Sequence, residues 1–172
     1  MFRITKIIPA LLLVLIVLNG LLLTKGYCDE GRYFKVLKDQ KYSYYLDTTN
    51  MRATVSKDKK WASFNCWIKA KATDEGIKYR IQTKQKNGFK IKEYRNFDYI
   101  SMHVIISVNL QNYDIVPQLL EVADYSQDED ILDYASFPFR GEEADFDSAD
   151  FSSTFYCATL NCVTYALDKH MF

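Results

Sequence analysis

Alternation of apolar and polar residues predicts strands along most of residues 31–137. The clearest case is the segment 61–69, in which every second residue is apolar or a thiol: Ala62, Phe64, Cys66 and Ile68. A period of two is typical of a strand with one buried face. The segment 101–110 has apolar residues on both sides in its middle, which is typical of a central strand.

Shorter segments of similar composition complete the predicted sheet. They are rich in Val, Ile, Tyr and Phe, as strands are, and they cover residues 31–37, 42–46, 51–55, 118–125 and 131–137. The residues Asp47 to Asn50 predict a turn, because Asp, Thr and Asn side chains bond their own backbone. Pro117 is expected at the entrance of a strand, where a missing amide donor is tolerated.

The segment 77–95 is predicted to form a β-hairpin around Asn87-Gly88. A two-residue turn would mix apolar and charged residues on each face. A three-residue loop over 86–88, with Gly88 left-handed in a bulge, shifts the register by one and separates them. We therefore expect this second register, with one apolar and one cationic face.

From Ser152 onward the pattern changes to that of a helix. Apolar residues recur every three to five positions, with Ser152 or Asp150 as the N-cap: Phe151, Phe155, Ala158, Cys162 and Tyr165. The acidic segment 139–150 is expected to be irregular. Strands followed by one helix predict an α+β domain, an antiparallel sheet with a C-terminal helix packed on one face.

The first 26 residues have the pattern of an export signal. Arg3 and Lys6 precede an apolar run over residues 7–23. That run is shorter than the ~20 residues that a spanning helix needs, so we expect cleavage after Gly26 and a mature chain that starts near Tyr27. An uncleaved anchor is the main alternative, and a lipid-modified cysteine at position 28 is a weaker one. Residues 27–172 then form a single domain.

Charge is distributed unevenly along a chain whose net charge is zero. Residues 32–100 carry 17 Lys and Arg against 7 Asp and Glu, whereas residues 101–172 carry 2 against 13. Such asymmetry can indicate a charged partner. We favour the interpretation that the two halves face each other, within one fold or across a dimer, so that the fields largely cancel.

The best candidate for binding is the cationic face of the predicted hairpin. Its residues are Lys78, Arg80, Lys84, Lys86, Lys90 and Lys92. This face could meet an anionic polymer or an acidic protein surface. Nucleic acid is not expected, because few aromatic residues are interleaved with the charge. The alternative is that the lysines only protect the edge of a sheet from pairing.

No pattern of catalytic or metal-binding residues is evident, so we expect neither an enzyme nor a cofactor. A Cys66–His103 nucleophile pair would need adjacent strands, and two core residues are the simpler interpretation. Two acidic clusters lack the glycine and the closing glutamate of a calcium loop: Asp128, Asp130 and Asp133, and Asp145, Asp147 and Asp150.

Four motifs, in order, resemble the surface-adhesin E family of small exported bacterial proteins. They are Tyr44-Tyr45-Leu46-Asp47-Thr48, the strand ending Trp67-Ile68-Lys69, the turn from Tyr125 into Ile131-Leu132, and the segment from Ser153 to Cys162. The resemblance implies an antiparallel sheet with a C-terminal helix, and export to the cell envelope. The founding member of that family is an adhesin for host matrix proteins and epithelial cells. Two positions depart from the family pattern: Leu110 stands where many members have Cys, and a usual turn glycine is replaced around Asp130.

The cysteines of an exported chain are expected to be oxidised. Cys66 faces the predicted core, where the helix should pack, so it can pair with Cys162 or with Cys157. Cys157 and Cys162 are five residues apart and point in different directions on a helix. The alternative is a buried free thiol. A zinc site would need four convergent ligands, which these cysteines do not provide.

Together these features predict an exported, adhesin-like, non-catalytic binding module at the cell surface or in the envelope. Its partner would be an unknown protein or an anionic polymer, and it would touch a membrane only through its N-terminal segment. The alternative is a structural or assembly protein of the envelope that self-associates, as a homodimer, through its complementary charged halves.

We expect the protein purified from its native envelope to have the intact mass of a chain that starts at Tyr27. Comparison with and without reduction and alkylation should show two cysteines blocked by one disulfide, because export exposes thiols to an oxidising compartment. A full-length or lipidated mass would contradict cleavage after Gly26.

Overall fold

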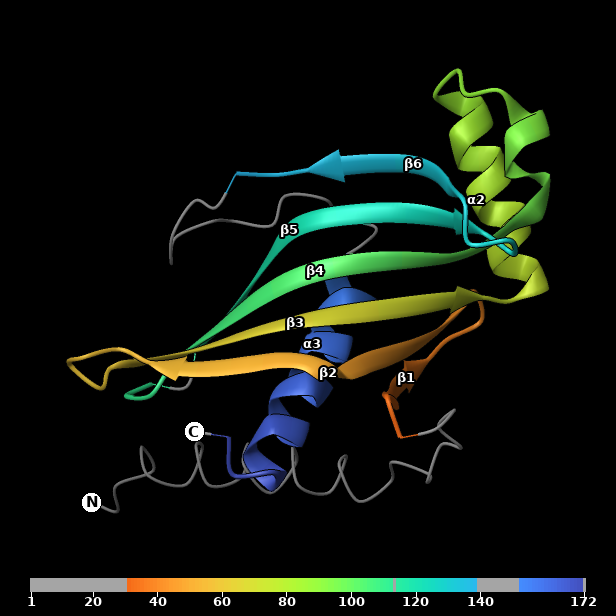
Figure 1. Ribbon diagram of the computed structural model, residues 1–172. Helices are drawn as coiled ribbons and strands as arrows, with labels where there is room; N and C mark the ends of the chain where they lie inside the picture. The colour runs from red at the N-terminus through yellow and green to blue at the C-terminus, as the bar shows by residue number, and fades with distance from the viewer. Residues whose placement is uncertain (1–30, 113, 139–151, 172) are drawn as a thin grey trace, which may run out of the picture.

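Six antiparallel strands form one sheet, and a helix covers one of its faces (Figure 1). The computed structural model describes residues 31–112, 114–138 and 152–171. The strands are neighbours in the order of the sequence: β1 (Tyr33–Lys38), β2 (Tyr42–Val55), β3 (Trp61–Ala72), β4 (Phe97–Asn109), β5 (Ile115–Ser126) and β6 (Ile131–Ser136). Helix α3 (Ser152–Asp168) crosses one face, and helix α2 (Asp74–Lys86) with the 3-10 helix η2 (Ile91–Asn96) stands at one end of the sheet. The predicted α+β class is confirmed.

The face of the sheet beneath α3 holds the core. Phe64, Cys66 and Ile68 of β3 are fully buried there, as the alternation of that segment predicts. On β4, the buried residues Met102, Val104, Ile106 and Val108 follow the same pattern. The core therefore combines one strand face with one helix face.

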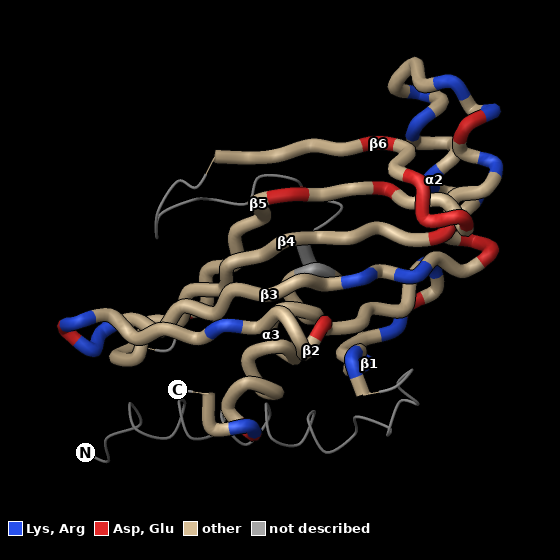
Figure 2. The backbone as a smooth tube through the Cα atoms, viewed as in Figure 1, with Lys and Arg blue, Asp and Glu red and all other residues tan. Residues whose placement is uncertain are grey.

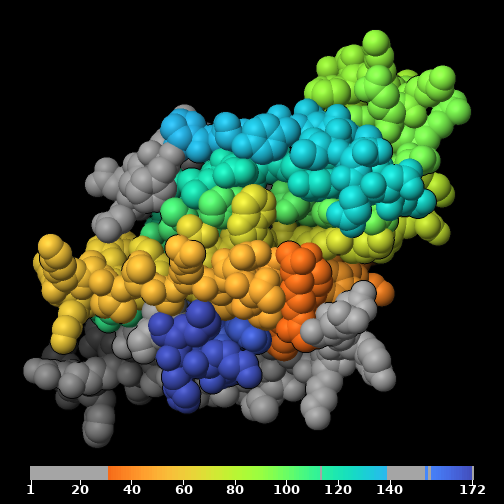
Figure 3. Space-filling view, viewed as in Figure 1, coloured from red at the N-terminus to blue at the C-terminus, as the bar shows by residue number. Residues whose placement is uncertain are grey.

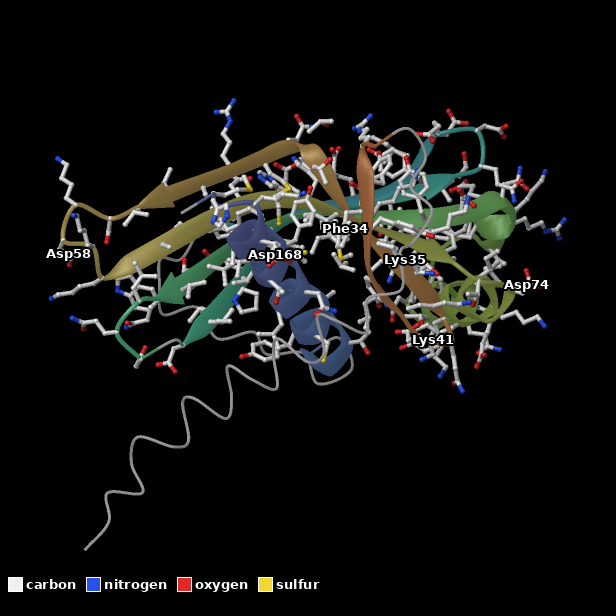
Figure 4. The ribbon with its side chains drawn as sticks, turned by 90° about the horizontal axis from the view of Figure 1, so that it is seen from below. Phe34, Lys35, Lys41, Asp58, Asp74 and Asp168 are labelled. Atoms are coloured by element: carbon white, nitrogen blue, oxygen red, sulfur yellow. The ribbon has the colours of Figure 1, made fainter. Side chains whose placement is uncertain are left out.

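Small residues let α3 lie close to the sheet. Its buried positions include Ala158, Cys162 and Ala166. The Asn161 side chain donates a hydrogen bond to the Val36 carbonyl at 2.6 Å, and the rings of Phe34 and Tyr165 lie 4.6 Å apart. Figures 3 and 4 show α3 against β1 and β2, with Phe34 beside it. The predicted C-terminal helix is thus confirmed.

Two details of the predicted strands are wrong. Residues 42–46 and 51–55 belong to one strand, β2, which is interrupted by an irregularity between Asp47 and Arg52. The expected turn chemistry persists there, because the Asp47 carboxylate accepts a hydrogen bond from the Thr49 amide. Pro117 lies inside β5, opposite Ile106, two residues before the register shifts at Leu119.

The predicted hairpin over residues 77–95 is also wrong, because this segment forms α2 and η2. The Thr73 hydroxyl caps α2 by accepting a hydrogen bond from the Gly76 amide, and the first turn carries acidic residues while the last carries lysines. Both features stabilise a helix. Gly88 has a φ of +81°, and it ends the helix where a hairpin turn was expected.

Several predictions fall on residues that the structure does not describe. These are the export signal over residues 1–26, the alternative lipid site at Cys28, and the whole acidic segment 139–150 with Phe151 after it. Within the described ranges, no helix has both the length and the apolar character needed to cross a membrane.

We expect Gly76→Ala to destabilise the protein, although Gly to Ala in a helix normally stabilises by ~1 kcal/mol. A methyl group at this position would overlap the Lys41 carbonyl oxygen. That oxygen already accepts hydrogen bonds from the Thr73 amide and hydroxyl, so it cannot retreat freely. Figure 4 shows Lys41 at the same end of the sheet as Asp74.

The measurement is urea unfolding, and the expected loss is more than about 1 kcal/mol. Gln82→Ala, at an exposed position of the same helix, is the control and should change stability by less than about 0.5 kcal/mol. A Gly76→Ala variant as stable as the wild type would contradict the contact between α2 and the β1–β2 turn.

Candidate functional site

The face of the sheet opposite α3 is polar and aromatic, and it carries the candidate site. Alternate residues of β3 point to this open face, because their neighbours point into the core. On β3 these include Asn65, Trp67 and Lys69, and their partners on β4 are Ile105, His103 and Ser101. We call this side of the sheet the open face.

A pocket of about 330 Å³ lies on the open face. Its lining includes Tyr33, Trp67, Lys69, Tyr99, Ser101 and Tyr125. Further lining residues carry charges or an amide: Arg32, Asp47, Asn50 and Glu129. Five strands and the β5–β6 turn contribute to it, so the pocket depends on the assembled sheet.

Two stacked ring pairs frame the pocket. The rings of Trp67 and His103 lie 4.5 Å apart and 8° from parallel, and those of Tyr99 and Tyr125 lie 4.7 Å apart and 9° from parallel. His103 is fixed in turn, with Nε2 2.9 Å from the Asn65 Oδ1. Stacked aromatic pairs contribute packing energy beyond their buried area. The walls of the pocket are therefore held in place before any ligand arrives.

An ion pair closes one side of the pocket. Asp47 is almost fully buried, and its Oδ2 accepts hydrogen bonds from Arg32 at 2.7 and 3.1 Å. Its Oδ1 accepts from the Thr49 amide at 3.0 Å and from the Thr49 hydroxyl at 2.7 Å. Burial alone would raise the pKa of Asp47, but the hydrogen bonds from Arg32 and Thr49 outweigh it and lower the pKa to about 2. Asp47 therefore stays ionised near neutral pH.

The β5–β6 turn supplies the second carboxylate of the pocket. The Tyr99 hydroxyl donates a hydrogen bond of 2.7 Å to Glu129. Burial is the larger cause that raises the pKa of Tyr99, and this hydrogen bond is the second. Glu129 has a φ of +65°, a conformation that glycine adopts at lower cost. The turn holds this residue because the Ser126 hydroxyl accepts hydrogen bonds from the amides of Asp128 and Asp130. Glu129 is thus positioned by backbone as well as by Tyr99.

Lys69 is the cation of the pocket that has no carboxylate partner. Its Nζ lies 3.7 Å from the centre of the Tyr99 ring and 5.5 Å from that of Tyr33. Among the described residues, no Asp or Glu oxygen lies within 4.0 Å of this ammonium group. An ammonium over aromatic rings is attracted to them, but its charge is not neutralised.

The six cations of the predicted hairpin face do not share one face. Arg80 and Lys84 point inward from α2 and form ion pairs with Asp124 at 2.8 and 3.3 Å. Lys84 also pairs with Asp133. The remaining four are exposed: Lys78, Lys86, Lys90 and Lys92. The prediction fails as a face because the segment is helical, so residues four apart, and not two apart, lie together. Binding of an anionic partner by the exposed four stays a prediction.

These ion pairs join the basic and acidic parts of the chain. Figure 2 shows Lys and Arg on α2 and η2 close to the Asp and Glu of the β5–β6 turn. Arg80 donates two hydrogen bonds to Asp124, at 2.8 and 3.0 Å, and the Tyr94 hydroxyl donates a third at 3.0 Å. The interpretation that the charged halves face each other within one fold is therefore supported at this end of the molecule.

Cys66 and Cys162 meet in the core. Both are buried free thiols. The pKa of Cys162 is raised well above its usual value, mainly by burial and secondly by its hydrogen bond with Cys66. Cys157 is exposed on α3. Among the two pairings that the sequence left open, the geometry favours Cys66 with Cys162. The disulfide itself stays a prediction.

The structure separates the residues of the conceivable catalytic pair. Cys66 points into the core, whereas His103 lies on the open face, because β3 pairs Cys66 with Val104 and Trp67 with His103. Within the described ranges, no three His, Cys, Asp or Glu residues converge on a possible metal position, and Asp145, Asp147 and Asp150 lie outside those ranges.

Comparison of the chain with protein-family models, with curated proteins and with solved structures finds no match. The resemblance to surface-adhesin E proteins therefore stays a prediction. The site rests on the geometry of the open face alone.

Sequence reasoning missed this pocket, although part of the signal was present. The alternation in β3 predicts that Trp67 and Lys69 leave the core. It does not predict that Tyr33, Tyr99 and Tyr125 lie around them, because that requires the order and register of the sheet.

We expect Asp47 to titrate near pH 2, as followed by NMR of its carboxyl carbon. Since its folded pKa is lowered from 3.8 to about 2, Asp47 contributes stability that is complete above pH ~4 and is lost as the pH falls toward 2. In Arg32→Gln the pKa should move back up, because the main partner of the carboxylate is gone. Asp47→Asn should show a smaller loss of stability between pH 4 and 2. A wild-type pKa near 3.8 would contradict the ion pair between Arg32 and the buried Asp47 carboxylate.

Proposed function

We propose that this chain is an exported, non-catalytic binding module at the cell surface or in the cell envelope, and that the pocket at Lys69 holds its ligand. The observation that carries the proposal is a preformed hollow on a rigid sheet, framed by stacked rings and containing an unneutralised ammonium. Ligand sites are typically concave, largely preformed and lined by aromatic side chains with a few polar groups.

The location of the site on strands supports a binding role. Side chains on strands are held more precisely than side chains on loops, and Trp67, Lys69 and Tyr99 all lie on central strands. The export pattern of the first 26 residues and the resemblance to surface-adhesin E proteins support the cell surface as the place of action. No step of chemistry is needed for this role.

The alternative, self-association through complementary charge, has less support. The inward-pointing cations Arg80 and Lys84 are already neutralised by Asp124 and Asp133 of the same chain. A dimer held by charge would therefore depend on the cations that stay exposed, such as Lys78, Lys86 and Lys92.

The test is saturable binding of the full chain, fluorescently labelled, to intact epithelial cells and to purified bacterial envelope. Ser101→Phe places a large side chain in the pocket without entering the core, so it should abolish binding to whichever surface the wild type recognises. The matched control is Ser63→Phe, the same change on the open face of β3 but outside the pocket lining. Phe is well tolerated in strands, so both variants should fold.

Binding that survives in Ser101→Phe would refute the pocket as the ligand site. Loss of binding in both variants would mean that the whole open face, and not the pocket, is the contact surface. Absence of wild-type binding to both surfaces, together with dimers in sedimentation velocity, would replace the proposal with self-association.

A further inference from the structure

The hydrogen-bonding capacity of the pocket is unevenly used. Its two carboxylates are engaged, Asp47 with Arg32 and Thr49 and Glu129 with Tyr99. The Lys69 ammonium has no acceptor among the described residues. The same holds for the hydroxyls of Tyr33, Ser101 and Tyr125, which make no hydrogen bond to another described residue. The pocket therefore offers the Lys69 ammonium and three hydroxyls to whatever enters it, and the Glu129 carboxylate beside them has a hydrogen bond from Tyr99 but no cation partner among the described residues.

We infer that the pocket binds an acidic sugar, a pyranose ring whose carboxylate pairs with Lys69 and whose ring lies against the aromatic walls. This inference rests on the proposed function and names the class of its ligand. The apolar C–H groups of a sugar ring pack against aromatic side chains, while its hydroxyls exchange hydrogen bonds with the free phenols and Ser101. A volume of about 330 Å³ suits a ligand of this small size.

The charges of the pocket argue against other ligand classes. A cation over the Tyr99 ring would compete with Lys69, whose ammonium already lies there at 3.7 Å. A phosphate group carries close to two negative charges at neutral pH, and only one unpaired cation faces it. Asp47 and Glu129 would repel the excess charge. A single carboxylate matches the single free ammonium.

The uncharged part of the ligand follows from the remaining polar groups. An aromatic or aliphatic acid would leave the hydroxyls of Tyr33, Ser101 and Tyr125 without partners after it displaced water, which costs binding energy. A sugar carries several hydroxyls on a compact ring and can satisfy them. The pocket therefore favours an acid that is also a polyol.

The experiment is isothermal titration of the full chain with two acidic sugars and one neutral control. Tetragalacturonate presents the carboxylate in a uronic-acid polymer, and 3′-sialyllactose presents it at the end of a glycan. The methyl ester of tetragalacturonate keeps the ring and loses the charge. We expect one of the two acidic sugars to bind. Its affinity should be at least about tenfold higher than that of its neutral ester, which lacks the charged carboxylate.

Lys69→Met tests the same contact from the protein side, because it keeps most of the apolar stem and removes the charge. It should lower the affinity for the acidic sugar at least about tenfold and leave the affinity for the neutral ester unchanged. The substitution and the esterification remove the same contact, so their effects should not add. If the ligand is sialyllactose, its methyl ester takes the place of the neutral control. Lys35→Met, on β1 of the same face and outside the pocket lining, should bind as the wild type.

The outcomes distinguish failure of the proposed ligand class from failure of the proposed binding function. Equal affinity of the wild type for the acid and its ester would overturn the carboxylate contact, and this comparison holds even if Lys69→Met folds poorly. A Lys69→Met variant that binds the acid as tightly as the wild type would also overturn it. Wild-type protein that binds neither acidic sugar overturns the ligand class. The proposed function would survive that result if Ser101→Phe still abolishes binding to cells or envelope while Ser63→Phe does not.

Discussion

The buried carboxylate of Asp124 is the constraint that holds α2 and η2 against β5 at one end of the sheet. It is 1% exposed, and it accepts hydrogen bonds from Arg80 and Tyr94 and pairs with Lys84. A buried charge without partners is destabilising by several kcal/mol. Helix α2 and η2 therefore cannot leave β5 without exposing or abandoning this group. The connection from β3 to β4, which holds α2 and η2, is thereby fixed against Asp124 of β5 and Asp133 of β6.

This anchoring also defines the pocket. Tyr94 lies in η2, directly before β4, and Tyr99 follows near the start of that strand. The turn that carries Glu129 links β5 to β6 beside the same end of the sheet, so the bond from Tyr99 to Glu129 joins two segments that the Asp124 network has already brought together. The candidate site and the ion-pair network thus share one support, while the Lys69 ammonium stays without a carboxylate partner among the described residues.

One strand serves both faces of the protein. In β3, Phe64, Cys66 and Ile68 pack under α3, and the alternate positions of the same strand place Trp67 and Lys69 on the open face. A helix on the open face would bury an unpaired ammonium, which is costly. As far as the described residues go, the sheet is covered on one side only, and the other side keeps polar and aromatic groups in a fixed array that suits recognition of a small polar ligand.

The sequence by itself determined the strands, the C-terminal helix and the side of β3 that faces the core, because these follow from local periodicity. It misassigned residues 77–95, where alternating lysines resembled a strand, although the Thr73 cap and the acidic first turn of α2 were local signals for a helix. Only the tertiary structure decided which charges are neutralised: Arg80 and Lys84 by Asp124, far along the chain, and Lys69 by none of the described carboxylates. The pocket belongs to the same class of property. It depends on strand order and register, which place Tyr33, Tyr99 and Tyr125 around Lys69, and no single segment encodes that arrangement.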